Sequence, residues 1–351
     1  MPKKTPGSGD ALKFPLSPME AALVDKIPEG PEWQYEPKWD GFRCIVFHDK
    51  GKVILQSKAK RQLGRYFPEL IEDILQLSAA NFILDGEIVV PVEGGIDFNQ
   101  LLQRIHPAAS RVQKLSREHP AHLVVFDFLS DEKGQSLLNA PLSERREKLE
   151  AFARRYFTKA ALVHLSPATR DISEAKDWLN HPGSFIDGVV AKQINLPYVP
   201  GKRAMAKFKR IRTADCVVGG FRYAEKSKIV GSLLLGLYDD EGKLNHVGFT
   251  SGIKTPERAA LVKKLQPLIE PPWFTGKAPG GPSRWSTERS AQWEPLRPQL
   301  LVEVSFDHVT DNRFRHGTRL LRWRPDKNPR QCTMEQLGSP RSNNFFFKLV
   351  S

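Results

Sequence analysis

The stretch EPKWDGFR occupies residues 36–43 and places Lys38 two residues before an Asp-Gly pair. We expect two short strands over residues 35–47, joined by a tight turn at this pair. A lysine at the end of a strand can serve as a nucleophile when desolvation or nearby cations lower its pKa. The same pattern also occurs in a plain hairpin turn with an exposed lysine, so the rest of the chain has to distinguish the two.

Further short motifs follow in chain order, and each is ambiguous by itself. In LDGE (residues 84–87), Glu87 follows a buried strand and could hold a ribose hydroxyl or a metal. In VFD (125–127), Phe126 could stack on an adenine ring or belong to the core. KFK (207–209) places two lysines on one face of a strand, which suits a polyphosphate. The remaining motifs are IDGVVAK at 186–192 and RPDK at 324–327, and each also fits a solvated strand or turn.

Composition limits the class of protein. The chain has 351 residues, of which 40% are hydrophobic, so it can bury a core without help from disulfides or metals. No apolar run approaches the length of a transmembrane helix, and the first residues lack the apolar region of a secretory signal. The three cysteines are far apart and form no CxxC pair, which argues against a zinc knuckle or a disulfide framework. We therefore expect a protein of the reducing cytoplasm, with no membrane partner.

The charge predicts a polyanionic partner. Lysine and arginine number 53 against 40 acidic residues, a net charge of +13. Residues 311–330 hold seven basic and two acidic side chains, and six of the seven are arginines, whose planar fork suits phosphate. The alternative is that these arginines pair with acids such as Glu303 and Asp307. Those that we expect on phosphate are Arg313, Arg315, Arg319 and Arg322.

The pattern of elements changes near residue 213. Before it, we expect helices over 67–77, 98–105, 143–157 and 173–179 among strands such as 81–90 and 122–129. After it come short strands with glycine turns, a helix over 255–268 and an irregular proline-rich segment over 271–298, a pattern typical of a small OB-type barrel. We expect an α+β protein with a disordered basic tail at 1–14, a first domain at 15–213 and an OB-fold β-barrel domain at 214–351.

The order of the motifs is more specific than any one of them. Lysine, acid, aromatic, acid-glycine with lysine, lysine pair and Arg-x-Asp-Lys, in this order, resemble the covalent nucleotidyltransferases. Whole phrases resemble the ATP-dependent DNA ligases of the bacterial ligase C and ligase D type, from about residue 15 to 332. These phrases are EPKWDGFR, RYFPEL, LDGEIV, FNQLLQRIHP, RTADCVV, GSLLLGLY and FRHGTRLLRWRPDK. The resemblance implies a nucleotidyltransferase domain of ATP-grasp-like antiparallel sheets and helices, followed by the OB-fold domain.

The resemblance also implies a reaction in DNA repair. Lys38 would attack the α-phosphate of ATP, and the AMP would pass from lysine to the 5′-phosphate of a nick in duplex DNA, which the 3′-hydroxyl then seals. Contacts to ATP would come from Glu36, Arg43, Lys58, Glu87, Phe126, Lys192, Lys207, Lys209, Arg324 and Lys327. Magnesium, or manganese in its place, would bind Asp40, Glu87 and Asp187. The chain departs from the family in having Asp187-Gly188 for Glu-Gly and Ser57-Lys58-Ala59 for Ser-Arg-Asn.

Other readings and partners stay open at this point. An RNA capping guanylyltransferase shares the lysine chemistry. An NAD-dependent ligase would need an extra domain before its lysine, for which 37 residues leave no room. A non-catalytic nucleic-acid-binding module would explain the charge but not six ordered motifs. The ligase reading implies a monomer at the bacterial nucleoid that acts on nicked double-stranded DNA. Repair polymerases or end-binding proteins are its open protein partners, and the repair pathway is undecided.

Overall fold

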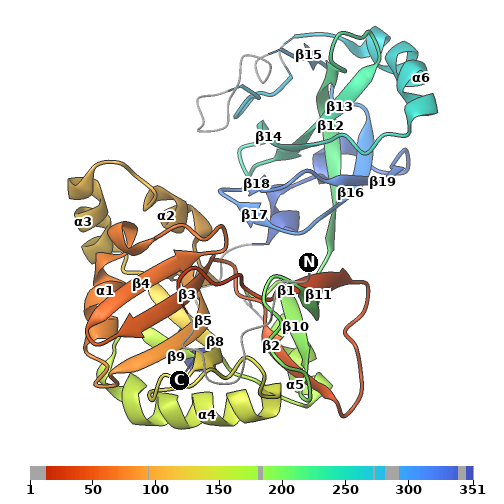
Figure 1. The fold of residues 1–351 in the computed structure, drawn as a ribbon. Helices are drawn as coiled ribbons and strands as arrows, with labels where there is room; N and C mark the ends of the chain where they lie inside the picture. Colours follow the sequence, from red (N-terminus) through yellow and green to blue (C-terminus); the bar gives the residue numbers. More distant parts are fainter. Residues whose placement is uncertain are drawn as a thin grey trace. The chain divides into compact units, whose positions relative to one another are not determined.

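The computed structural model describes residues 13–93, 95–180, 185–271, 273–280, 292–338 and 345–350. The chain forms two compact units (Figure 1). Unit 1 comprises Met1–Lys209 and Pro340–Ser351, and unit 2 comprises Arg210–Ser339. The expected second domain, 214–351, is therefore too long at its far end. The reason is that α7 (Phe345–Val350) buries Phe345 and Phe346 in the core of unit 1.

Unit 1 contains a five-stranded sheet with helices packed against it. Its strand order is β4 (Lys52–Ser57), β3 (Phe42–Asp49), β5 (Asn81–Val89), β8 (His122–Ser130) and β9 (Val163–Leu165). Every residue of the inner strand β8 is buried, as its apolar sequence predicts. α4 (Leu142–Tyr156) packs on β8 and α1 (Pro68–Leu75) on β4. α2 (Phe98–Gln103) and the hairpin of β6 (Pro91–Val92) and β7 (Gly95–Ile96) complete this part, with α3 (Ala109–Glu118), which the sequence did not lead us to expect.

A second, four-stranded sheet of unit 1 carries most of the motif lysines. Its order is β1 (Glu20–Val24), β11 (Arg203–Lys209), β10 (Gly188–Gln193) and β2 (Trp33–Pro37), and α5 (Ile172–Asn180) packs on β2 and β10. The pairs β1–β11 and β8–β9 are parallel, so the sheets that we expected to be antiparallel are mixed. Long connections join the members of each pair, α4 lying between β8 and β9, and parallel pairing requires such crossovers.

Unit 2 is built on one curved sheet with a helix beside it. The order is β14 (Leu244–Thr250), β13 (Val230–Tyr238), β12 (Arg212–Tyr223), β16 (Leu301–Phe306) and β19 (Arg319–Trp323), with β15 (Glu294–Pro295) on β12. α6 (Thr255–Leu265) packs on β13, and β17 (Val309–Thr310) pairs with β18 (Arg313–Phe314). Among the described residues, a single bridge between Thr250 and Thr318 connects the two edges, so the OB-type sheet is partly open and no closed barrel forms.

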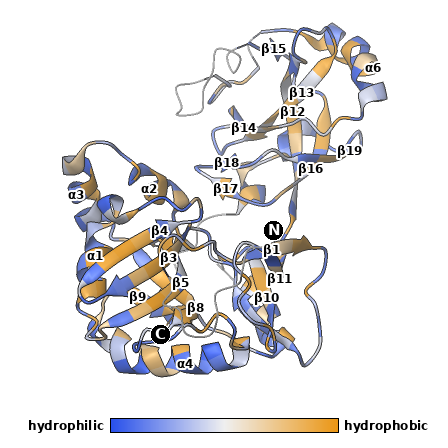
Figure 2. Ribbon diagram, in the orientation of Figure 1, coloured by the Kyte–Doolittle hydropathy of each residue, from blue (hydrophilic) through white to orange (hydrophobic). Residues whose placement is uncertain are grey.

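Burial follows the hydropathy pattern in both units. Apolar residues concentrate on the strands and on the inner faces of the helices (Figure 2).

Residues 1–12 of the expected tail lie outside the described residues, whereas Phe14 packs on Phe47 with ring centroids 5.8 Å apart, so the tail does not extend to residue 14. The expected irregular segment at 271–298 lies partly outside the described residues. No helix in the described parts of the chain has the length and apolar character to span a membrane.

Candidate active site

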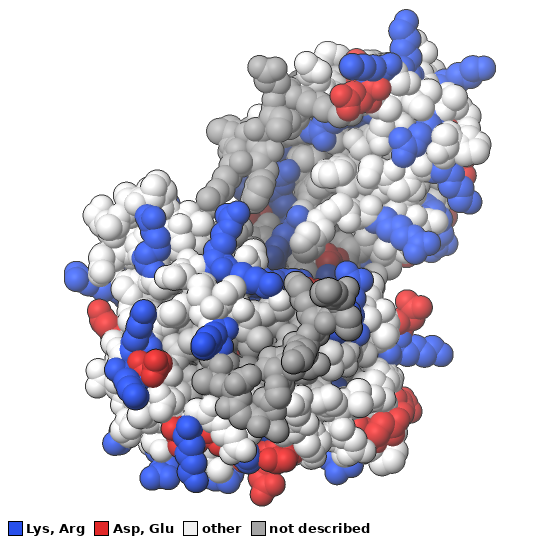
Figure 3. Space-filling model, in the orientation of Figure 1, with Lys and Arg blue, Asp and Glu red and all other residues white. Residues whose placement is uncertain are grey.

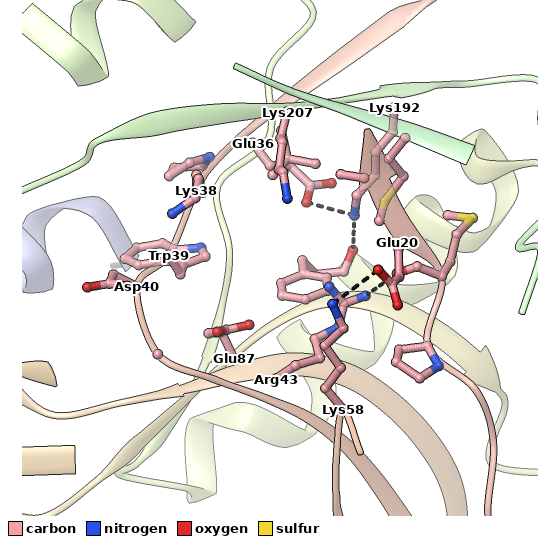
Figure 4. A pocket seen from close by; sticks show the side chains of 18 residues that line it. Glu20, Glu36, Lys38, Trp39, Asp40, Arg43, Lys58, Glu87, Lys192 and Lys207 are labelled. Atoms are coloured by element: carbon pink, nitrogen blue, oxygen red, sulfur yellow. Dashed lines mark hydrogen bonds and ion pairs between the residues drawn. The ribbon is translucent and has the colours of Figure 1, made fainter. Parts of the chain in front are cut away.

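A pocket in unit 1 brings together side chains from both of its sheets (Figure 4). It lies where the end of β2 and the turn after it face β3, β5 and β8. Nine residues singled out from the sequence line it: Glu36, Lys38, Asp40, Arg43, Lys58, Glu87, Phe126, Lys192 and Lys207. The motif residues that are scattered over 172 positions of sequence therefore form one cavity wall.

Lys38 is held at this pocket by its backbone and its side chain. The residue directly follows β2, and its N–H donates to the carbonyl of Gly188 at 3.0 Å. The ammonium contacts both carboxylate oxygens of Asp187, at 3.2 and 3.3 Å. A Cβ on Gly188 would lie 2.9 Å from Cδ of Lys38 and would also collide with the carbonyl of Phe208, so glycine is required for this approach. The two motifs that contribute Lys38 and Asp187 are thus in direct contact.

Glu36 and Lys192 form a buried ion pair at the back of the pocket. Their side chains are 3% and 4% exposed, and the charged atoms are 2.7 Å apart. Gln34 donates to the other oxygen of Glu36 at 2.9 Å, and Lys192 also donates to the carbonyl of Phe126 at 3.2 Å. The carboxylate and the ammonium are therefore both fixed by further hydrogen bonds, as buried charges require.

Two cations lie close to the ring of Phe126. The guanidinium of Arg43 lies 4.5 Å from the centre of its ring and the ammonium of Lys192 lies 4.8 Å from it. Arg43 is in turn held by Asp85, with contacts of 2.6 and 2.7 Å, and Tyr198 donates to Asp85 at 2.7 Å. Burial alone would lower the pKa of Arg43, but the carboxylate of Asp85 raises it overall, so Arg43 stays charged.

Glu87 is the carboxyl group whose acidity is most altered at the pocket. Burial raises the pKa of Glu87 to about 7, an effect that Arg43 and Lys38 oppose and that Asp40 reinforces. In the described part of the chain, no three acidic, histidine or cysteine side chains are grouped closely enough to hold a metal by themselves. Asp40, Glu87 and Asp187, which the family resemblance implied for magnesium, therefore form no such group in that part of the chain, and their role toward a metal stays a prediction.

The other predicted lysines differ in their surroundings. Lys58 pairs with Glu20 at 3.1 Å and its side chain is 64% exposed. Desolvation lowers the pKa of Lys207, and the nearby charges of Lys209, Lys58 and Lys38 lower it further. Lys209 ends β11 and does not line the pocket.

Arg324 and Lys327 form a separate cluster within unit 2. Both contact Asp215, at 2.7 and 2.6 Å, and Arg324 also contacts Asp326 at 2.8 Å. Arg322 pairs with Glu303 at 2.6 Å, which is the structural alternative that we considered for the basic run. Lysine and arginine side chains are spread over the visible surface of both units (Figure 3).

Several residues of the site gave no signal in the sequence analysis. Met19, Glu20 and Met205 line the pocket but lie in no motif. Tyr198 lies 113 positions after its partner Asp85, and no pattern links them. Asp85 and Asp215 were within quoted phrases, LDGEIV and RTADCVV, so a search for buried acids beside the motif cations could have found them.

Comparison with known proteins shows the family. The ATP dependent DNA ligase domain family matches residues 18–209, and the ATP dependent DNA ligase C terminal region matches residues 226–327. DNA ligase C1 of Mycolicibacterium smegmatis is 41% identical over 344 residues, which cover 95% of this chain and 96% of that protein. DNA ligase C of Mycobacterium tuberculosis is 41% identical over 345 residues, covering 93% and 94%. A solved Lig E DNA ligase structure has a TM-score of 0.54 at 15% identity, covering 87% of this chain and 99% of that one, and supports the fold alone.

The fold defines a nucleotidyltransferase domain followed by an OB-fold domain. With these matches, the chain belongs to the ATP-dependent DNA ligases. The family resemblance, the fold class and the enzyme class inferred from the order of the motifs are confirmed. The same matches set aside the capping enzyme, the NAD-dependent ligase and the non-catalytic module.

The altered acidity of Glu87 predicts a change in pH-dependent stability. Between its usual pKa of 4.5 and the folded value of about 7, the folded chain holds a proton that the unfolded chain has lost. The stability contributed at this site therefore falls as the pH rises through that window. The Glu87→Gln protein has no titrating group at this position, so its free energy of unfolding should not fall in this way. The difference in free energy of unfolding, variant minus natural protein, should therefore increase by about 1–3 kcal/mol from about pH 5 to pH 8. Urea unfolding without divalent cations measures this change.

The matched control is Glu118→Gln, since Glu118 is an exposed glutamate of α3 that pairs with Lys114. It should show the same difference from the natural protein at both pH values. If the difference in free energy of unfolding between Glu87→Gln and the natural protein is also equal at the two pH values, Glu87 ionises normally in the folded protein.

Proposed function

We propose that this ligase seals 5′-phosphate/3′-hydroxyl nicks in duplex DNA through an AMP adduct on Lys38. The observation that carries the proposal is the placement of Lys38. Its ammonium contacts Asp187 at 3.2 Å, at the edge of a pocket that offers an aromatic ring and several cations. An amine nucleophile, a partner for its proton and positive charge for phosphate oxygens are the three elements that nucleotidyl transfer to lysine requires.

The pocket has a part for each portion of ATP. Phe126 offers a ring for stacking on adenine, and the buried Glu36–Lys192 pair fixes the wall from which that ring projects. Arg43 and Glu87, which line the same pocket, would contact the ribose. Lys207 supplies positive charge toward the phosphates, supported by Lys58 and Lys209. Attack by the Lys38 nitrogen on the α-phosphorus forms the N–P bond and expels pyrophosphate, and the proton of the amine leaves toward Asp187.

A divalent ion fits this donor set as a partner of the nucleotide. Magnesium commonly uses one or two protein carboxylates and takes its other ligands from phosphates and water, so a three-carboxylate cage is not needed. Glu87 and Asp187, with Asp40 near Glu87, are the residues that would hold it. Bound magnesium, or manganese in its place, would neutralise phosphate charge during the transfer.

The later steps need DNA rather than ATP. AMP passes from Lys38 to the 5′-phosphate of the nick, and the 3′-hydroxyl then displaces AMP and joins the strand. The basic character of both units suits a duplex partner. We place the protein at the nucleoid in the bacterial cytoplasm, as a monomer that acts in DNA repair alongside a repair polymerase or an end-binding protein.

The direct test is sealing of a defined nick with ATP, with NAD or with no cofactor. Sealing with ATP alone supports the proposal, and sealing that needs NAD contradicts it. A ribonucleotide placed on either side of the nick would show how far the strand preference extends.

Lys38→Arg should abolish the AMP adduct while the fold is kept. Arginine retains the charge that pairs with Asp187, but its guanidinium stays protonated and cannot attack phosphorus. The mass of the intact protein after incubation with ATP and magnesium measures the adduct. Lys148→Ala, which removes a half-buried lysine of α4 that pairs with Glu144, is the control and should be adenylated like the natural protein. An adduct of normal yield on the Lys38→Arg protein would assign the nucleophile to another residue.

The cluster in unit 2 should act in the first step. We propose that Arg324 and Lys327 contact the pyrophosphate that leaves ATP, with Asp215 holding both side chains ready. Lys327→Ala should slow adduct formation by about tenfold or more, the cost of losing one stabilising charge. It should leave sealing of a pre-adenylated nick nearly unchanged, because no pyrophosphate leaves in that step. Lys243→Ala, an exposed lysine of unit 2, is the control. Equal loss of both steps would assign Lys327 to DNA binding or folding.

A further inference from the structure

Helix α7 packs against the segments on both sides of the Lys38–Asp187 contact. Phe346 meets the ring of Trp39 edge to face, with centroids 5.9 Å apart, and Trp39 directly follows Lys38. Phe345 meets Phe185 at 5.8 Å, and Phe185 precedes Asp187 by two residues. One short helix from the far end of the chain thus contacts the neighbours of the nucleophile and the neighbours of its carboxylate partner.

These four rings form a single aromatic cluster: Trp39, Phe185, Phe345 and Phe346. The ring centroids of Trp39 and Phe185 are 6.2 Å apart, and those of Phe346 and Phe185 are 6.4 Å apart. Trp39 is 6% exposed and its indole N–H donates to Ser166 at 2.9 Å, which fixes the plane of the ring. Trp39 lines the same pocket as Lys38 (Figure 4). A displacement of the cluster would therefore move a residue of the pocket wall.

Asp187 depends on its flanks for its position. The paired part of β10 begins one residue later, at Gly188. On the other side, Phe185 lies in the aromatic cluster and Ile186 is 2% exposed in the same core. The side chain of Asp187 can meet Lys38 only while this core holds the segment against the end of β2.

We propose that α7 positions the Lys38–Asp187 pair for attack on the α-phosphate, with Phe346 as the residue that transmits its packing. The inference rests on the proposed role of Lys38 as the nucleophile. The chain leaves unit 1 after Lys209, forms unit 2 and returns to unit 1 to supply α7. A complete nucleophile site thus requires the residues beyond unit 2, although none of them lines the pocket.

The test compares two phenylalanines of α7. Phe346 is 2% exposed and meets both Trp39 and His122. The next residue, Phe347, is 43% exposed and meets His122 and Phe346, with ring centroids 5.7 and 5.0 Å apart. The measurements are the rate of AMP adduct formation at saturating ATP, the KM for ATP and the melting temperature. A misplacement of about 1 Å by a mutation far from the chemistry can cost about 100-fold in rate. We expect Phe346→Ala to lower the adenylation rate by about tenfold to 100-fold, with the KM for ATP changed less than about twofold.

Phe347→Ala should keep the natural rate. Phe346→Leu keeps most of the apolar volume without the ring edge that meets Trp39, and should keep the natural melting temperature with a reduced rate. If the Phe346→Ala protein does not fold, the adenylation rate of the Phe346→Leu protein tests the proposal. A Phe346→Leu protein with the natural rate, or Phe346→Ala and Phe347→Ala proteins with equal rates, would overturn the proposal.

The same experiment separates this inference from the proposed function. If the natural protein forms no AMP adduct that depends on Lys38, the proposed function fails and α7 has no nucleophile to position. If the natural protein forms the adduct and the Phe346 variants form it at the natural rate, the role of α7 alone is refuted.

Discussion

The close approach of the Lys38 side chain to Gly188 is the contact on which the rest of the site depends. Any side chain at position 188 would meet both Lys38 and the carbonyl of Phe208. Gly41 has the same restriction on the other side of the turn, where a Cβ would collide with the carbonyl of Ile88. The two glycines let the strand end that carries Lys38 lie against β10 and β5 together. The ion pair with Asp187 follows from that geometry, since Asp187 directly precedes Gly188.

Fixed charges then complete the walls of the pocket. Glu36–Lys192 and Arg43–Asp85 each join two strands, and both pairs have additional hydrogen bonds. Buried ion pairs contribute little net stability, because desolvation offsets their attraction, but breaking one leaves an unpaired charge. Their consequence here is that Phe126 has a defined position beside Arg43 and Lys192. A preorganised pocket of this kind needs little rearrangement when a polyphosphate arrives.

The sequence predicted the parts of this site that are encoded locally. Lys38, Glu87, Phe126 and Lys192 lie in short motifs whose strands could be recognised, and the order of those motifs revealed the family. The contacts that depend on distant partners escaped prediction. Asp85 meets Tyr198 only because the loop before β11 folds over β5, and no periodicity marks that contact.

The domain boundaries could not be predicted fully from the sequence, because they too depend on contacts between distant residues. The apolar residues of α7 are compatible with the core of either unit, and only tertiary packing assigns them to unit 1. The parallel pairing of β1 with β11 was not predicted either. β1 is a short segment with no alternating pattern, and its partner lies at the other end of the domain. The family resemblance implied a metal site on Asp40, Glu87 and Asp187, but local sequence does not show that Asp187 is paired with the lysine.

The most direct test of this account is a single-turnover chase. The protein is adenylated with ATP and magnesium, free ATP is removed, and a nicked duplex is added. The account predicts that each adenylated protein transfers its AMP to one 5′-phosphate and seals one nick, and that the mass of the protein returns to its unmodified value. If the adduct persists on the protein in the presence of the nick, or is released as free AMP while the nick stays open, the lysine-bound nucleotide is not the intermediate of sealing and the account is contradicted.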